Sequence, residues 1–170
     1  MKMWRVAYKY ALICGGFLLL AFWISYRFGS NPMIDLRHLF LDLVIFALFI
    51  FFSCKEFKSY KNGGILHFWQ GMTLAFMTYV PGTLLFLVGI VLMFYLDPNL
   101  LVDFKGQAIA FMENNRIEFL QDMTDDQFED RLNQIEGVTA TQMISSATFK
   151  KIMAGFFVSP VITVILRKKP

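Results

Sequence analysis

The sequence predicts an all-α, polytopic integral membrane protein with four transmembrane helices and an extramembrane helical segment between the third and the fourth. The chain is 56% apolar and only 17% charged, whereas soluble domains have roughly 45–50% apolar and about 25% charged residues. Its mean hydropathy is +0.52. Four apolar runs are each long enough to cross a hydrocarbon core of about 30 Å. They make one membrane domain spanning residues 1–170.

The first span covers about residues 6–26 and follows a basic start with Lys2, Arg5 and Lys9. A signal peptide begins in the same way, but residues 25–28 (Ser-Tyr-Arg-Phe) provide no small-residue cleavage site. We therefore expect an uncleaved helix. The breaker cluster at residues 29–32 (Gly-Ser-Asn-Pro) ends it.

The second span is expected at about residues 36–53, with a bulky apolar core at 43–52. His38 and Asp42 stand near its start, where the polar headgroups would surround them. A basic connection follows at residues 55–61, and it leads into a turn formed by Asn62, Gly63 and Gly64.

The third span, about residues 65–96, is the longest apolar run and would form a helix of roughly 48 Å. Pro81 has no N–H to donate to the carbonyl of Met77, so a kink is expected there. The hydroxyls of Thr78 and Thr83 are candidates to satisfy the freed carbonyl.

The outer segment, about residues 97–148, has a different composition, because ten of the thirteen acidic residues of the chain fall within it. Asp97 followed by Pro98 is typical of an N-cap and a first helical position. We expect one helical piece at residues 98–123 and a second that begins with the capping box at Thr124 and ends at Gly137.

The last span, about residues 149–166, can belong to a longer helix, because residues 139–142 (Thr-Ala-Thr-Gln) form another capping-box pattern. Pro160 predicts a second kink that frees the carbonyl of Phe156. The run Arg167, Lys168 and Lys169 follows.

Charge predicts the orientation of the chain. With four spans, the first ten residues, the 55–61 connection and the last residues share one side and carry nine basic residues against one acid, Glu56. The positive-inside rule then predicts cytoplasmic termini and an outer acidic segment, which faces the periplasm if the cell has two membranes. Lys150 and Lys151 on the outer side weakly oppose this orientation.

Small residues recur at helical spacing in three of the four spans, and such stripes mark close helix contacts in lipid. We expect the third span to pack centrally against the first and fourth, and the Phe-rich second span to be more lipid-exposed. The residues expected to form helix contacts or kinks in the third and fourth spans are Gly71, Ala75, Thr78, Pro81, Gly82, Gly89, Gly155, Ser159 and Pro160.

The sequence shows no catalytic, cofactor-binding or metal-binding constellation. His38 and His67 would lie at opposite ends of the membrane and could not share a metal ion. Cys14 and Cys54 are expected to be packing residues. The spans lack charged residues near their centres, although such residues are usual in transporters. The net charge of +3 does not indicate nucleic-acid binding.

Several short motifs resemble a bacterial four-span membrane family catalogued as domain of unknown function four-one-nine-nine. They are the Asn62-Gly63-Gly64 turn, the Gln70-Gly71 pair and Asp97-Pro98, with Lys9-Tyr10 in the first span and a basic end after the last span. The resemblance covers nearly the whole chain and implies a compact four-helix protein of Gram-negative bacteria. It implies no activity. A Ser or Thr helix start would be expected after the glycines, where this chain has Leu66-His67.

The sequence favours a non-enzymatic accessory or interaction protein that acts through helix packing and its acidic outer segment. That segment is expected first of all to be a solvated helical hairpin that rests on the bundle or on the membrane surface. A membrane or periplasmic protein partner is the next alternative, and a metal ion bound by its carboxylates is the last. A small transport or permeation component working as a homo-oligomer is the alternative function, and a lipid-modifying enzyme comes third.

Overall fold

The computed structural model describes residues 2–28, 31–32, 36–97 and 99–168, and it is helical throughout, as predicted. Gly29, Ser30 and Pro98, on which sequence predictions depended, lie outside these ranges. The helices are α1 (Lys2–Arg27), α2 (Leu36–Glu56), the π-helix η1 (Phe57–Lys61), α3 (Phe68–Leu96), α4 (Leu100–Asn114), α5 (Arg116–Asp122), α6 (Asp125–Gly137) and α7 (Ala140–Leu166).

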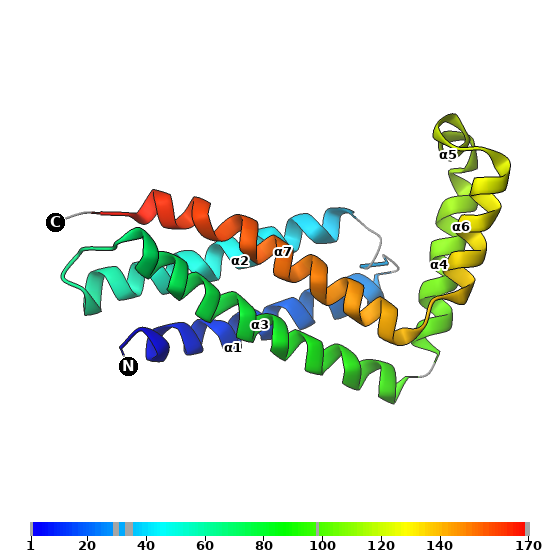
Figure 1. Ribbon diagram of the computed structural model, residues 1–170. Coiled ribbons are helices and arrows are strands. Elements are labelled where there is room, and N and C mark those ends of the chain that lie inside the picture. Colours follow the sequence, from blue (N-terminus) through cyan, green and yellow to red (C-terminus); the bar gives the residue numbers. More distant parts are fainter. Residues whose placement is uncertain (1, 29–30, 33–35, 98, 169–170) are drawn as a thin grey trace.

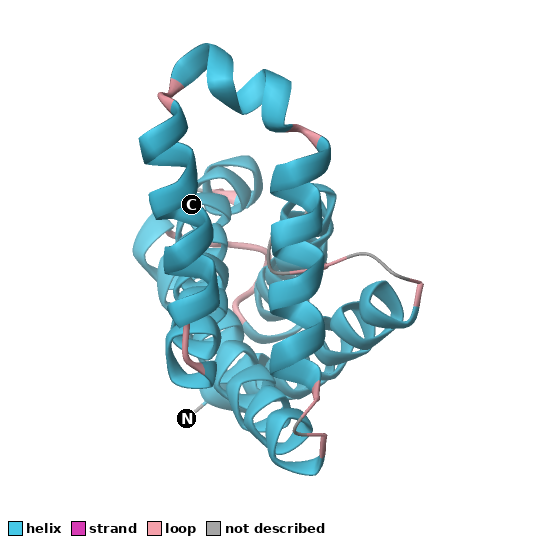
Figure 2. Ribbon diagram, turned by 90° about the vertical axis from the view of Figure 1, so that its right-hand side faces the viewer, coloured by secondary structure: helices cyan, strands magenta, loops and turns pink. Residues whose placement is uncertain are grey.

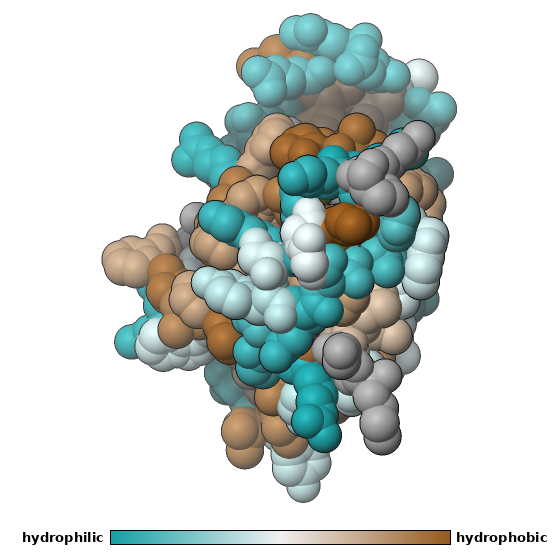
Figure 3. All heavy atoms as spheres, turned by 90° about the vertical axis from the view of Figure 1, so that its left-hand side faces the viewer, coloured by the Kyte–Doolittle hydropathy of each residue, from teal (hydrophilic) through white to brown (hydrophobic). Residues whose placement is uncertain are grey.

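Four helices in the described part of the chain are long and apolar enough to cross a membrane, namely α1, α2 with η1, α3 and α7. They lie side by side as a bundle with both termini at one end (Figure 1). Hydrophilic side chains gather over that end, where the basic connection and the termini lie (Figure 3). The α3 helix starts at Phe68 rather than near residue 65, and α2 continues past Ser53 into η1.

The α3 helix packs against both α1 and α7, and its glycines lie at these contacts. A Cβ added to Gly71 would lie 3.1 Å from the Thr163 hydroxyl oxygen, and one added to Gly82 would lie 3.2 Å from the Ala11 carbonyl oxygen. Gly89 similarly faces Leu19 of α1. At Gly82 the backbones of α3 and α1 therefore approach closely, whereas Gly71 and Gly89 leave room for the side chains of Thr163 and Leu19.

The expectation that the second span is more lipid-exposed is wrong. The α2 helix contacts α1, α3 and α7, and a larger share of it is buried than of α3. Phe46 and Ile50 are completely buried, while Phe40 and Phe52 are exposed. A helix that is bulky on all sides can bury one face and present another to lipid, so its lack of small residues does not exclude it from the core.

The turn before α3 is held by side-chain hydrogen bonds. Gly63 and Gly64 have φ values of 60° and 80°, which residues with a Cβ rarely adopt. The Asn62 amide donates to the Ile65 carbonyl oxygen (2.8 Å) and to the Gln70 side-chain oxygen (3.1 Å). That oxygen also accepts the N–H of His67 (3.1 Å), so His67 is the N-cap where a Ser or Thr was expected.

The C-terminal end of α7 is joined to this turn. Leu66 and Lys168 form an antiparallel bridge with two backbone hydrogen bonds of 3.0 Å. The Lys58 ammonium donates to the carbonyl oxygen of Leu166 (2.9 Å), where the helix dipole favours a cation.

The helices α3 and α7 continue as α-helices through Pro81 and Pro160. The Thr78 hydroxyl is within hydrogen-bond distance of the Leu74 carbonyl oxygen and Ser53, rather than satisfying Met77. In α7, Ser159 donates to the Gly155 carbonyl oxygen (2.6 Å) in the same way.

The outer segment forms a helical hairpin, α4 to α6, which lies crosswise to the bundle at the end opposite to the termini (Figure 1). Seen from that end, α4 and α6 run side by side and α5 joins them (Figure 2). The prediction of one helical piece to residue 123 is wrong, because the helix breaks at Asn115. The Asn115 amide donates to the Phe111 carbonyl oxygen (2.7 Å), an alternative to continued helix.

The predicted capping boxes at Thr124 and Thr139 are confirmed. Asp97, by contrast, is not the N-cap of the next helix. Its backbone N–H closes the end of α3 on the Met93 carbonyl oxygen, and its side chain accepts the N–H of Asn99 (3.1 Å). Asn99 is the N-cap of α4.

Candidate functional site

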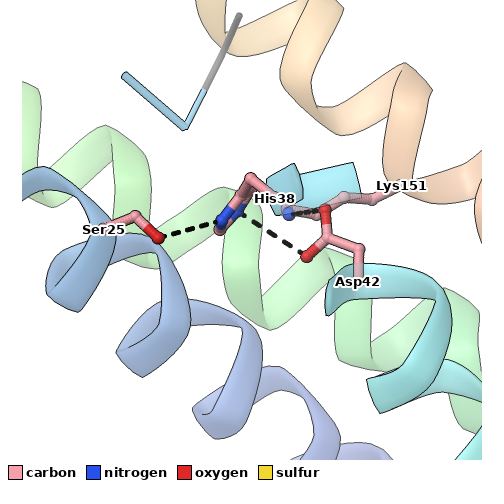
Figure 4. A network of polar contacts seen from close by, with 4 residues as sticks. All are labelled: Ser25, His38, Asp42 and Lys151. Atoms are coloured by element: carbon pink, nitrogen blue, oxygen red, sulfur yellow. Dashed lines mark hydrogen bonds and ion pairs between the residues drawn. The ribbon is translucent and has the colours of Figure 1, made fainter. Parts of the chain in front are cut away.

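A buried ion pair joins two of the membrane helices. The Lys151 ammonium on α7 lies 2.5 Å from Oδ2 of Asp42 on α2 (Figure 4). Each residue is 3% exposed. A charge at such a place is costly to desolvate, and the opposite charge within hydrogen-bond distance compensates for it.

All four spanning helices contribute side chains around the pair. His38, one turn before Asp42 on α2, places Nε2 3.7 Å from Asp42 Oδ1, and Ser25 on α1 lies 3.2 Å from His38 Nδ1 (Figure 4). The Lys151 ammonium lies 4.3 Å from the centre of the Phe86 ring on α3. The negative face of that ring stabilises the cation from a second direction.

The pair lies inside the bundle, toward the end that carries the outer hairpin. Asp42 is six residues after the first residue of α2, or about 9 Å along the helix, and Lys151 is eleven residues into α7, or about 17 Å. The sequence placed both at that end, with Asp42 at headgroup level and Lys151 on the outer side, near the start of the span at 149–166. The structure adds that both residues are buried inside the bundle.

One feature of the sequence could have revealed the site. Lys151 stands four residues before Gly155 and so continues the every-fourth-residue stripe of Gly155, Ser159 and Thr163. All four residues are buried. On α2, His38, Asp42, Phe46, Ile50 and Cys54 also recur at every fourth position and are buried. The charged residues therefore share the inward faces of their helices.

The chemistry available at this site is ionic and acid–base. Asp42, His38 and Lys151 can each hold a proton. Asp42 Oδ1 is buried and has no hydrogen-bond partner among the described residues. The described residues contain no cluster of three or more His, Cys, Asp and Glu side chains that could hold a metal ion. Cys14 and Cys54 are free and buried.

The residues expected to form helix contacts lie in the bundle interior. Ala75, Thr78 and Ser159 are fully buried, and a Cβ added to Gly155 would lie 2.6 Å from the Tyr79 ring carbon Cγ. Together with Gly71, Gly82 and Gly89 they lie where α3 packs against its neighbouring helices. Their burial and their close contacts with neighbouring helices make them packing residues.

The outer hairpin is a second candidate site. Its described acidic side chains are mostly exposed, and α6 buries only Phe128. Arg116 contacts Asp125 (3.1 Å) and Glu129 (3.7 Å) and lies 5.0 Å from the Phe128 ring centre. Surface pairs of this kind contribute little to stability, so most of this charge is available to a partner.

The fold and the buried ion pair define a small helical membrane protein of four spans. The chain belongs to the family described as "Protein of unknown function (DUF4199)", whose family model matches residues 9–168. This confirms the resemblance seen in the sequence. Comparison with curated proteins and with solved structures finds no match.

Proposed function

We propose that the protein is a non-enzymatic interaction subunit of the bacterial inner membrane, which presents its outer hairpin to a membrane or periplasmic protein. The observation that carries this proposal is the hairpin itself. It lies crosswise beyond the bundle and has limited contact with it, mainly through the first residues of α4 (Figure 1). Its exposed surface is acidic, which favours a partner with a basic surface.

The bundle supports this role by fixing the position of the hairpin. The hairpin joins α3 at its start and α7 at its end, and Lys151 anchors α7 to α2 just below that junction. Tyr26 at the end of α1 donates to Asp103 of α4 (3.0 Å), and Phe104 is fully buried against Phe22. A rigid base of this kind lowers the entropic cost of binding a partner.

Photo-crosslinking in cells tests the interaction role. A photoreactive residue at Asp126 or Asp130, both exposed on α6, should give a discrete protein adduct. The same residue at Val88 or Val161, exposed on the sides of the bundle, should give lipid adducts. Asp126→Asn with Asp130→Asn should lower the adduct yield obtained from a neighbouring probe at Gln134. Diffuse labelling at both hairpin positions would reject the proposal.

The buried ion pair favours a second candidate function, a small transport or permeation component that works as an oligomer. Ionisable residues at membrane depth commonly mark ion or proton pathways. Asp42, His38 and Lys151 form such a group within one bundle.

Reconstitution separates the two functions. Proteoliposomes loaded with a pH-sensitive dye should conduct protons under a membrane potential if the pair is part of a pathway, and Asp42→Asn should abolish that flux. Arg131→Gln, at an exposed position of the hairpin, serves as the control. The absence of any flux difference between the protein and empty vesicles would leave the interaction role as the better account.

A further inference from the structure

A cavity of about 420 Å³ lies at the base of the outer hairpin, between α4, the end of α6 and the start of α7. Six of its ten lining residues are apolar: Phe104, Ala108, Ile135, Val138, Met143 and Ala147. Ligand sites of small amphiphiles have volumes of roughly 300–1,000 Å³ and apolar walls with a few polar groups. The cavity is therefore large enough for part of a lipid.

The charged residues that line this cavity are both basic. The lining contains Lys105 and Lys150 but no Asp or Glu, although residues 97–148 carry ten acids. The Lys105 ammonium donates to the Glu136 carbonyl oxygen (2.7 Å), which holds it at the cavity and leaves two of its three donors. An anionic group with an apolar tail complements such a lining.

The position of the cavity along the bundle indicates that a membrane lipid supplies this anionic group. About 20 residues cross the bilayer core, and counting back from Leu166 on α7 brings the core to near Ala147. The cavity, lined by α7 from Gln142 to Lys150, is thus at the headgroup level of the leaflet opposite to the termini. Phe149, Phe156 and Phe157 are exposed on the same helix and face lipid.

We propose that this cavity binds an anionic phospholipid of that leaflet, with the phosphate between Lys105 and Lys150 and acyl carbons against the apolar wall. The lipid bridges the hairpin to α7. This site is independent of the interaction role, because a lipid can be bound whether or not the hairpin has a protein partner.

The test uses the full chain in phosphatidylcholine nanodiscs that contain a photoactivatable phosphatidylglycerol probe. Mass spectrometry should map the label to peptides carrying Phe104 and Met143. Replacing both lysines (Lys105→Gln with Lys150→Gln) should lower this labelling about thirtyfold, since each lysine near an anionic lipid contributes on the order of 1 kcal/mol. The matched control, Lys55→Gln with Lys61→Gln, removes the same charge at the opposite end and should leave the label unchanged.

A cavity-filling variant keeps the test valid if the loss of Lys105 loosens the hairpin. Ser146→Trp, at an exposed position in the cavity lining, retains both lysines, so it should abolish the label while the melting temperature stays close to that of the parent protein. Equal labelling by a phosphatidylcholine probe would overturn the proposal. Competition by inorganic phosphate as effective as that by phosphatidylglycerol would also overturn it, because it would identify a site for a soluble anion. Covalent dimers formed through the cavity would overturn it as well, because they would identify a protein contact.

Discussion

Asp42 and Lys151, 109 positions apart in the chain, form a buried ion pair that fastens α2 to α7. At this position α2 and α7 are joined by the ion pair and not only by the packing of small residues. The pair lies where the bundle passes into the outer hairpin. His38 of α2, Ser25 of α1 and Phe86 of α3 complete its surroundings. One polar contact inside the membrane therefore involves every span.

Removing one member of this pair should destabilise the bundle strongly. Lys151→Met leaves the Asp42 carboxylate buried without its cation and is expected to cost about 3–5 kcal/mol of folding free energy. The double variant Asp42→Val with Lys151→Met should recover most of that loss, because no charge is left buried. Thermal unfolding in mild detergent measures both.

Arg131→Met is the control for this experiment, because it removes an exposed cation of the outer hairpin, away from the pair. It should change the stability by less than about 0.5 kcal/mol. A double variant as unstable as Lys151→Met alone would show that the pair contributes through packing or through His38 rather than by mutual neutralisation.

Two adjacent glycines of α1 should respond in opposite ways to the same substitution. A Cβ on Gly15 would lie 2.7 Å from the Gly82 carbonyl oxygen of α3, whereas a Cβ on Gly16 meets nothing within 4 Å. Gly15→Ala should therefore push α1 from α3 and lower the melting temperature. Gly16→Ala should be neutral or stabilise the helix by up to about 1 kcal/mol. Equal effects of both would contradict the close α1–α3 contact.

The turn before α3 depends on a backbone conformation that favours glycine. Gly64→Val places a β-branched residue at φ 80°, which costs on the order of 1–3 kcal/mol. Gly64→Asn should cost less, because Asn tolerates this region. Limited trypsin digestion at Lys58 and Lys61 in detergent measures the difference. If the three proteins were cleaved at the same rate, the turn would not hold this loop.

Local patterns predicted most of the fold. Apolar runs and breakers located the four spans, and the two Thr capping boxes were found because all their atoms belong to four consecutive residues. Asp97 was misjudged for a related reason. Its backbone N–H closes the end of α3, and its side chain accepts a hydrogen bond within the following turn. The sequence alone does not distinguish these roles from that of an N-cap.

The ion pair could not be recognised by looking at each span separately. Asp42 and Lys151 each stand about two or three turns from the start of a spanning helix. Taken alone, a charge near the end of a span is expected to lie among the polar headgroups. Their burial follows from which faces of α2 and α7 meet, and this is a tertiary property. The every-fourth-residue stripe through Lys151 indicates the inward face, but it does not identify Asp42 as the partner.

The orientation of the bundle can be tested with reporters at its two ends. In the sequence, the first ten residues, the 55–61 connection and the last residues carry nine basic residues against one acid, Glu56. We therefore expect a fluorescent protein after Lys168 to fold in the cytoplasm, and alkaline phosphatase inserted after Gly137 to be active in the periplasm. Replacing Lys55, Lys58 and Lys61 by Gln should lower this asymmetry. A fluorescent protein that stays dark after Lys168, together with an inactive phosphatase after Gly137, would invert the orientation and place the acidic hairpin in the cytoplasm.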